Sequence, residues 1–203
     1  MKLVDVLSRI DAVPLRNGRR VIAIAGAPAS GKSTLAAQLA AHREDAFVVP
    51  MDGFHKDNAN LQAAGLLDRK GAPETFDAEG FVAFARGLRK PRDLRYPTFD
   101  RATDSVVING GVLPCDARTV LVEGNYLLLD ALPWSDLSDF WDFTLLLDVP
   151  IDVLATRLVT RWRNYGFDPD AARTRAMQND IPNARLVRSS SVQANLTVAG
   201  TEF

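Results

Sequence analysis

A glycine-rich stretch at residues 26–34, GAPASGKST, has the residue types and the spacing of a phosphate-binding loop. In the pattern Gly-x-x-x-x-Gly-Lys-Ser, Gly26 and Gly31 let the backbone bend so that its N–H groups point toward phosphate oxygens. Lys32 is spaced to reach the outer phosphates of a nucleotide, and the Ser33 hydroxyl to hold Mg²⁺. The residues expected to contact bound ATP are Gly26, Ala27, Pro28, Ala29, Ser30, Gly31, Lys32, Ser33 and Thr34. Residues outside this phosphate loop must decide whether the nucleotide drives a phosphoryl transfer, a conformational change or simple binding.

Two carboxylates follow apolar runs that are typical of buried strands. Asp52, in VVPMDGFH, could take the proton from an acceptor hydroxyl or help hold Mg²⁺, since ligand chemistry gathers at the carboxyl ends of strands. The alternative is that Asp52 satisfies a turn at Gly53, because Asp-Gly is a common turn pair. Glu123, in TVLVEGNY, ends a run where an unpaired charge would be costly, so its partner is expected to be Mg²⁺ or a structural salt bridge.

Arginines gather near the end of the helix that is predicted over residues 151–164, in RLVTRWRNYG. An arginine beside a mobile segment can close over a transferring phosphoryl group. Arg161 and Arg163 are therefore candidate nucleotide contacts, and Arg161 is also a candidate catalytic residue. The alternative is a solvated basic face, which suits the negative end of a helix dipole.

A break follows this helix at NYGFDPD. Gly166 relaxes the limits on the backbone, and Pro169 restrains Asp168 away from the helical region. We therefore predict that residues 164–179, the lid segment, order over bound nucleotide.

The elements that must position these residues alternate between strand-like and helix-like runs. Buried strands are predicted over residues 19–26, 46–52, 118–124 and 142–150, with a short strand at 195–198. Helices are predicted over residues 33–42, 78–90 and 151–164, and in part over 171–189. This alternation predicts an α/β fold with a central, mainly parallel sheet and helices on both of its faces.

Local signals define three further features. Asp77 is a good N-cap for the helix that follows it. The run SVVINGGVL is predicted to be a β-hairpin that turns at Asn109-Gly110, a pair that suits a type I′ turn. Residues 56–77, here called the connecting segment, form the longest stretch without strand character, and long connections in a compact domain tend to be functional.

Bulk properties exclude several classes of protein. A length of 203 residues fits a single domain, here 1–203, and the net charge of −1 provides no basic field for nucleic acid. No apolar stretch approaches the ~20 residues needed to span a membrane. Cys115 is the only cysteine, so an internal disulfide is excluded and a cytoplasmic location is expected.

With these motifs in order, the sequence resembles the P-loop kinases of the phosphoribulokinase, uridine kinase and bacterial pantothenate kinase group. GAPASGKST matches the nucleotide loop of the group, MDGFH its Asp-Gly-Phe segment, VEGNYLLL its Glu-Gly segment and ATRLVTRWR its lid arginine region. The stretches GFHKDN, KGAPETFD and NDIPNARLV are similar to those of small bacterial proteins labelled fructose transport system kinases.

The resemblance, which covers most of the chain, implies a three-layer P-loop NTPase fold like that of nucleoside kinases, with a small β-hairpin and a helical lid. It implies Asp52 as catalytic base, Glu123 as a partner of Mg²⁺ and Arg161 as the lid arginine on the phosphates. The expected activity is ATP- and Mg²⁺-dependent phosphorylation of a hydroxyl group on a small metabolite, such as a sugar, a sugar acid or a vitamin-like compound.

The acceptor is expected to bind between DGFHKDN, RYPTFDR, EGNY and NDIPN, through His55, Arg101, Tyr126 and Asn183. Pantothenate kinases carry Tyr and His in the segment that is PTFDR here, so Arg101 stands in place of His. Because a guanidinium matches carboxylate or phosphate, Arg101 suggests an anionic acceptor. The alternative is that Arg101 only shapes the wall of the pocket by pairing with Asp100, Asp104 or Glu74.

Two other functions stay open. A nucleoside kinase of the uridine type would differ only in its acceptor. A nucleotide-binding regulator coupled to sugar transport would need no acceptor at all, and a carboxylate at Asp52 disfavours it. Formation of a homodimer is also left open.

Overall fold

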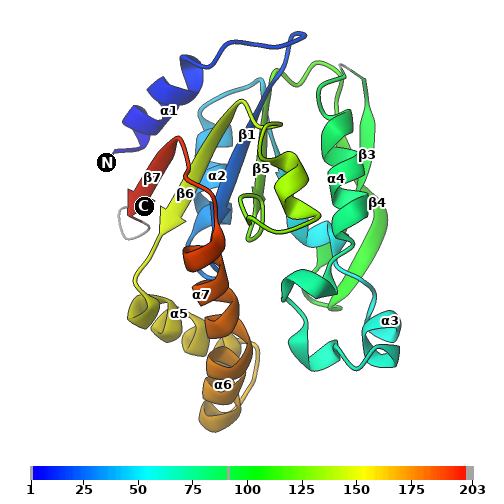
Figure 1. The fold of residues 1–203 in the computed structure, drawn as a ribbon, viewed down its shortest axis with the longest axis vertical. Coiled ribbons are helices and arrows are strands. Elements are labelled where there is room, and N and C mark those ends of the chain that lie inside the picture. Colours follow the sequence, from blue (N-terminus) through cyan, green and yellow to red (C-terminus); the bar gives the residue numbers. More distant parts are fainter. Residues whose placement is uncertain (1, 91, 200–203) are drawn as a thin grey trace.

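The computed structural model describes residues 2–90 and 92–199 (Figure 1). Within them, a sheet of parallel strands in the order β2-β5-β1-β6-β7 forms the centre of the molecule. Its strands are β1 (Arg20–Gly26), β2 (Ala46–Pro50), β5 (Thr119–Gly124), β6 (Phe143–Asp148) and β7 (Leu196–Ala199). Every residue of β1 and β5 is buried, as expected for inner strands of a parallel sheet that is covered on both faces. The predicted α/β class is confirmed.

The pleat of β1 divides the core into two layers. Val21 and Ala23 point into one apolar cluster, and Ile22 and Ile24 point into another, because successive side chains of a strand face opposite sides. The helices that supply buried residues to these clusters are α1 (Leu3–Asp11) and α2 (Lys32–Ala41) on the Ile22 side, and α4 (Ala78–Gly87) and α7 (Ile181–Ser190) on the Val21 side. The sheet therefore has helices on both faces, as predicted.

The predicted lid segment lies beyond the carboxyl end of the sheet. Helix α5 (Ile151–Asn164) ends at the expected break, where Gly166 has φ +90°, and α6 (Pro169–Arg175) begins after the N-cap Asp168. A π-helical turn (Ala176–Asp180) then joins α6 to α7. Figure 1 shows α6 at the end of the molecule opposite α1. Among the helices of residues 2–90 and 92–199, none combines the length and the apolar character needed to cross a membrane.

The hairpin differs from the prediction. SVVINGGVL is a single strand, β4 (Ser105–Leu113), which pairs antiparallel with β3 (Leu94–Asp100), and the chain reverses between these strands. Asn109 has the left-handed φ of +57° that a type I′ turn needs, but it lies opposite a register shift between Tyr96 and Thr98. A positive φ serves a β-bulge as well as a turn, so the predicted turn position is wrong.

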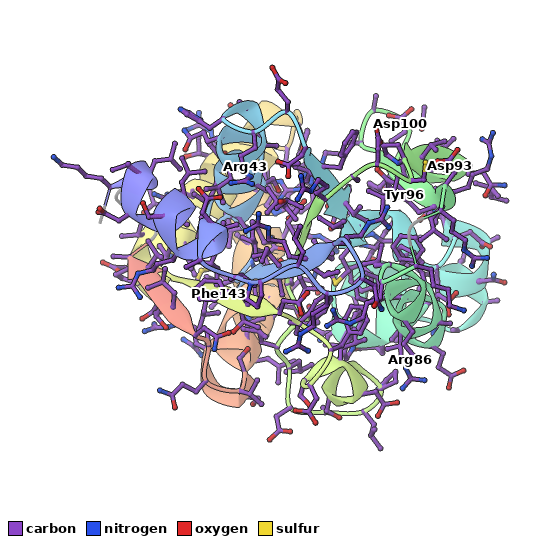
Figure 2. The ribbon with its side chains drawn as sticks, turned by 90° about the horizontal axis from the view of Figure 1, so that it is seen from above. Arg43, Arg86, Asp93, Tyr96, Asp100 and Phe143 are labelled. Atoms are coloured by element: carbon purple, nitrogen blue, oxygen red, sulfur yellow. The ribbon has the colours of Figure 1, made fainter. Side chains whose placement is uncertain are left out.

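Figure 2 shows Tyr96 and Asp100 of the hairpin on one side of the molecule and Phe143 of β6 on the other. Tyr96 is buried, and its hydroxyl donates to the carbonyl of Val48 in β2 at 3.4 Å. The hairpin is therefore attached beside the edge of the main sheet.

The connecting segment has no long regular element. It contains α3 (Asn58–Ala63) and 3₁₀ turns at Leu67–Arg69 and Pro73–Thr75. A β-bridge joins His55 to Phe76, so the two ends of the connecting segment lie next to each other. Further 3₁₀ turns lie at Met51–Phe54 and Trp134–Leu137.

Candidate active site

The phosphate loop is shaped by backbone conformations that few residues adopt. Ala29 has φ +63° and Gly31 has φ +96°, both in the left-handed region. At Gly26, an added Cβ would lie 2.6 Å from Ser30 Oγ and 3.2 Å from the carbonyl oxygen of Leu147, so a side chain there would force its neighbours to shift. Gly31 is the N-cap of α2 and Lys32 its first residue, so the loop ends at the positive end of a helix. Such a concave loop at a helix N-terminus suits phosphate.

Ser33 of this loop is hydrogen-bonded to Glu123 of β5. Glu123 is at the end of β5, opposite Ile24 of β1 and Pro50 of β2, and is only 4% exposed. It accepts a hydrogen bond from Ser33 Oγ at 3.0 Å. Burial raises the pKa of the Glu123 carboxyl, while attraction to Lys32 opposes this shift. The buried carboxylate and the hydroxyl thus form a pair of oxygens beside the loop.

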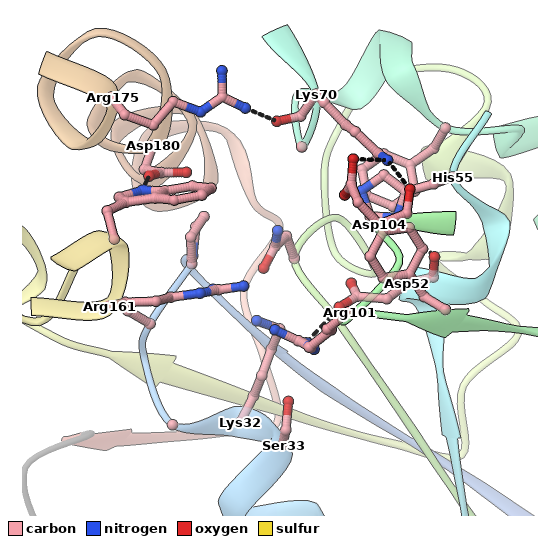
Figure 3. A pocket seen from close by; sticks show the side chains of 18 of the residues that line it. Lys32, Ser33, Asp52, His55, Lys70, Arg101, Asp104, Arg161, Arg175 and Asp180 are labelled. Carbon is pink, nitrogen blue, oxygen red and sulfur yellow. Dashed lines mark hydrogen bonds and ion pairs between the residues drawn. The ribbon is translucent and has the colours of Figure 1, made fainter. Parts of the chain in front are cut away.

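Asp52 lies in the 3₁₀ turn after β2, and its Oδ2 accepts a hydrogen bond from Arg101 Nη2 at 2.8 Å (Figure 3). This ion pair replaces the partners that the sequence suggested for Arg101. Asp104 pairs instead with Lys70, and Glu74 with Arg69. Arg101 therefore reaches from the hairpin to the predicted base.

A cavity of about 320 Å³ is lined by the loop, Asp52 and Arg101, whereas Glu123 is not among its lining residues. Of the residues predicted from the sequence, its walls contain Pro28, Ala29, Gly31, Lys32, Ser33, Thr34, Asp52, His55, Arg101 and Arg161. Figure 3 shows Lys32 and Ser33 at one end, with Arg161 reaching in from the side opposite Asp52. The structure thus places a phosphate-binding loop, a carboxylate and an arginine around one space.

His55 has a fixed position in this cavity. Its Nδ1 lies 2.7 Å from the carbonyl oxygen of Asp52, and its ring packs against Phe76 and Phe99 with centroid distances of 4.0 and 4.8 Å. Burial lowers the pKa of His55, which favours the neutral imidazole. A neutral ring held this way donates from Nδ1 to the Asp52 carbonyl, so it can form part of a pocket wall or accept a hydrogen bond at Nε2.

The three arginines of α5 differ in where they lie relative to the cavity. Arg161 lines the cavity, with its guanidinium 5.7 Å from the ring centre of Tyr165. Arg157 contacts the phosphate loop from outside, since its Nη1 lies 3.3 Å from the carbonyl oxygen of Ala29. Arg163 is exposed and does not line the cavity.

Other predicted residues lie outside the cavity walls. Tyr126 is fully buried, and its hydroxyl donates to the carbonyl of Gly71 at 2.5 Å, so it supports the connecting segment from behind. Asn183 is 2% exposed within α7. Gly26, Ala27 and Ser30 of the phosphate loop are buried and do not line the cavity. These five residues could act on a ligand only through their neighbours or after a movement of the chain.

Lys70 and Asp104 line the cavity but were not singled out as ligand-binding residues in the sequence. Lys70 Nζ lies 2.9 Å from Asp104 Oδ2, donates to Asn58 Oδ1 at 2.6 Å and sits 4.8 Å from the ring centre of Phe99. The signal for Lys70 was the KGAPETFD stretch of the connecting segment. The pair fixes that segment to the tip of the hairpin.

Arg175, Asn179 and Asp180 bring the region after α5 to the same cavity. Arg175 Nη1 donates to the carbonyl of Asp68 at 2.5 Å, and Asn179 Nδ2 donates to the carbonyl of Lys70 at 2.9 Å. Asp180 accepts a hydrogen bond from Trp162 Nε1 at 2.5 Å. The lid segment and the connecting segment are therefore in direct contact.

The oxygens near the loop fit Mg²⁺ of a nucleotide complex better than a metal held by protein alone. Within residues 2–90 and 92–199 there is no cluster of three or more His, Cys, Asp or Glu side chains arranged to bind a metal. Mg²⁺ commonly takes one or two protein oxygens and completes its shell with phosphates and water. Ser33, Glu123 and Asp52 can supply such oxygens.

Comparisons with known proteins point to kinases. No family model matches the chain. The Escherichia coli K12 protein YggC is 36% identical over 190 residues, which are 91% of this chain and 79% of YggC. A Schizosaccharomyces pombe protein described as "Putative uridine kinase C227.14" is 33% identical over 199 residues. The match covers 91% of this chain and 85% of the S. pombe protein. The crystal structure of a "putative fructose transport system kinase" from Silicibacter sp. TM1040 is 44% identical, with a TM-score of 0.94 over 98% of this chain and 99% of that one.

Proposed function

Because the chain belongs to the P-loop kinases of the phosphoribulokinase, uridine kinase and pantothenate kinase group, we propose that it phosphorylates a hydroxyl group of a small metabolite with ATP and Mg²⁺. Kinases of this kind transfer the terminal phosphoryl group of a nucleotide mainly by positioning the reactants and stabilising charge. The acceptor and the roles of individual residues are the parts of the proposal that go beyond family membership. We also propose a cytoplasmic location, in keeping with the single cysteine.

The observation that carries the proposal is the cavity shared by the phosphate loop and Asp52. Pairing of Pro50 with Glu123 sets the end of β2 beside the end of β5, and Asp52 follows Pro50 by two residues. A protein that only senses a nucleotide does not need a carboxylate at this place. An enzyme that activates a hydroxyl does.

In the proposed reaction, an acceptor hydroxyl replaces Arg101 at Asp52 Oδ2. Asp52 takes the hydroxyl proton as the acceptor oxygen forms its bond to the terminal phosphorus of ATP. The bond from that phosphorus to the bridging oxygen breaks, and ADP carries away the electron pair. Lys32, the loop N–H groups and Arg161 stabilise the negative charge that spreads over the transferring group.

Mg²⁺ would be held by Ser33, with Glu123 and Asp52 contributing through direct or water-mediated contacts. Once bound, the ion neutralises charge on the phosphate oxygens. The chain itself keeps Glu123 buried beside Ser33, so the oxygens that receive the ion are already oriented.

The acceptor is a sugar, a sugar acid or a vitamin-like compound in this proposal. The name of the Silicibacter structure supports fructose among the candidates, and that of the S. pombe relative supports a nucleoside as the second candidate class. Arg101 is paired with Asp52, and the acceptor hydroxyl that replaces it at Asp52 releases the guanidinium. The released guanidinium can contact a hydroxyl or an anionic group of the acceptor.

A panel of sugars, sugar acids, pantothenate and nucleosides, assayed for ADP formation with ATP and Mg²⁺, tests the proposal. At least one acceptor should raise ADP formation well above the background hydrolysis, and Lys32→Ala should abolish the increase. If no acceptor raises turnover in the parent protein, the protein would instead be a nucleotide-binding regulator.

A further inference from the structure

One buried amide oxygen in the cavity wall, Oδ1 of Asn125, is unpartnered within the described part of the chain. Asn125 lines the cavity and is only 8% exposed, yet its Oδ1 accepts no hydrogen bond from any residue that the structure describes. A buried carbonyl oxygen without a donor raises the free energy of the folded protein. Unpartnered polar groups of this kind are rare in native proteins and require an explanation.

The strand register places Asn125 and the proposed base at the same edge of the sheet. Pro50 of β2 is paired with Glu123 of β5, and Asp52 and Asn125 each lie two residues beyond that pair. Gly124 keeps the two chains close, since an added Cβ there would lie 2.6 Å from Met51 Cβ. The amide and the carboxylate therefore follow neighbouring strands, and both line the cavity.

Several other polar side chains of the cavity are already paired. Arg101 is bound to Asp52, and Lys70 to Asp104 and Asn58. Phe76 and Phe99 supply apolar surface, and His55 is held by the Asp52 carbonyl. The missing partner of Asn125 must donate a hydrogen bond, and a hydroxyl is the donor that small polar metabolites most often carry.

We propose that Asn125 binds a second hydroxyl group of the acceptor while Asp52 takes the proton from the first. This inference rests on the proposed kinase function and narrows the acceptor to compounds with at least two hydroxyl groups. A site built to hydrogen-bond a substrate hydroxyl rejects the analogue that lacks it, because its own polar group is then left unpaired. Asn125 is thus a specificity residue, distinct from the groups that stabilise the phosphates.

The free protein provides a test that needs no acceptor. In Asn125→Leu a side chain of similar size replaces an unsatisfied amide, so the melting temperature should be unchanged or should rise by about 2 °C or more. Asn195→Leu is the matched control. Its Oδ1 accepts hydrogen bonds from the N–H and the hydroxyl of Thr144 at 2.8 and 2.9 Å, so the melting temperature of this variant should fall. A fall of equal size in Asn125→Leu would overturn the proposal, because it would show a structural amide.

Turnover provides the second test. D-fructose, D-glycerate and uridine are assayed with ATP and Mg²⁺, and the compound that reacts is compared with mono-deoxy analogues that keep the reacting hydroxyl. The parent should prefer the full compound over one analogue by about 100-fold or more in kcat/KM, and Asn125→Leu should lose most of that preference with KM for ATP unchanged. An unchanged preference would contradict the proposal. If none of the three compounds reacts with the parent, the kinase assignment is in question, and the melting comparison still decides whether Asn125 is structural.

Discussion

At the scale of single residues, Asp52 is the group on which the proposed chemistry depends. Its carboxylate lies in the turn after β2 and accepts a hydrogen bond from Arg101. The sequence predicted the position of Asp52 through the Asp-Gly-Phe segment. It did not predict the partner, because the hairpin that carries Arg101 joins the cavity only through tertiary packing.

Asp52→Asn keeps the shape of the side chain and removes its charge. We expect kcat to fall about 10²-fold or more, the usual effect of losing a general base, with little change in the affinity for ATP. Steady-state kinetics on the best acceptor and titration with a non-hydrolysable ATP analogue measure the two effects. A large loss of Mg²⁺·ATP affinity with kcat retained would make Asp52 chiefly a metal ligand.

His55 should give the stability of the protein a pH dependence. Because burial lowers the pKa of His55 below its ordinary value of 6.5, the unfolded chain takes up a proton there before the folded protein does. The stabilising contribution of neutral His55 is therefore present above pH 6.5 and is lost as the pH falls through the lower, folded-state pKa. We expect the melting temperature of the parent to fall more steeply between pH 7.5 and pH 5 than that of His55→Phe, which keeps an aromatic ring. Parallel curves for the two proteins would show that the histidine does not titrate in this window.

The limits of prediction at this scale have a physical cause. Arg175 and Asn179 donate to the backbone carbonyls of Asp68 and Lys70. Every residue has a backbone carbonyl, so the residue types do not show which carbonyl accepts. Lys70 and Asp104 come from separate segments whose contact depends on where the hairpin turns. By contrast, the phosphate loop was predictable because the residues that define it are nine consecutive residues of the sequence.

At the scale of elements, the inner strands were predictable because they are continuous apolar runs rich in β-branched residues. The hairpin turn was not, since Asn109 adopts a positive φ that serves a bulge and a turn equally. Because the turn was placed within residues 105–113, the sequence did not predict that β3 pairs with β4. It therefore did not predict that the hairpin brings Arg101 to Asp52.

Gly53 is where the hairpin meets the turn that carries Asp52. A Cβ at Gly53 would lie 1.8 Å from the carbonyl oxygen of Pro97, so Gly53→Ala should force the two apart. We expect a loss of about 1–3 kcal/mol in the free energy of unfolding by urea, together with a lower kcat. Gly87→Ala, at the end of α4, is the control, because a Cβ there makes only ordinary contact with Leu94 at 3.8 Å; it should leave kcat unchanged and the stability unchanged or slightly higher. Equal stability of the two variants would contradict the close approach at Gly53.

The lid segment, residues 164–179, is expected to order when nucleotide binds. It follows the helix that carries Arg161. Near its start, Gly166 has φ +90°, a backbone conformation that residues with a side chain rarely adopt. Hydrogen exchange should slow in this segment when a non-hydrolysable ATP analogue and Mg²⁺ are added. Because Arg175 and Asn179 contact the connecting segment, amides near residues 68–71 should slow with it. Equal exchange in the free and bound protein would refute the lid.

At the scale of the whole molecule, the arrangement of the sheet explains why the chemistry lies where it does. β2, β5 and β1 are neighbours in one parallel sheet, so Asp52, Asn125 and the phosphate loop all emerge at the same edge. The hairpin closes one side of the cavity, and α5 and the segment after it close the other (Figure 3). The sequence predicted the sheet and the loop, while the enclosing walls depend on long-range contacts that only the folded chain displays.

Transfer of the terminal phosphoryl group of ATP to carbon-bound oxygen is the central claim, and isotope-labelled ATP tests it most directly. The protein is incubated with the best acceptor and ATP that carries ¹⁸O in its terminal phosphoryl group, and the products are analysed by mass spectrometry. We predict a phosphate ester of the acceptor that contains the labelled oxygens, formed in step with ADP and lost in Lys32→Ala. Label found only in inorganic phosphate, at a rate that no acceptor changes, would contradict the claim.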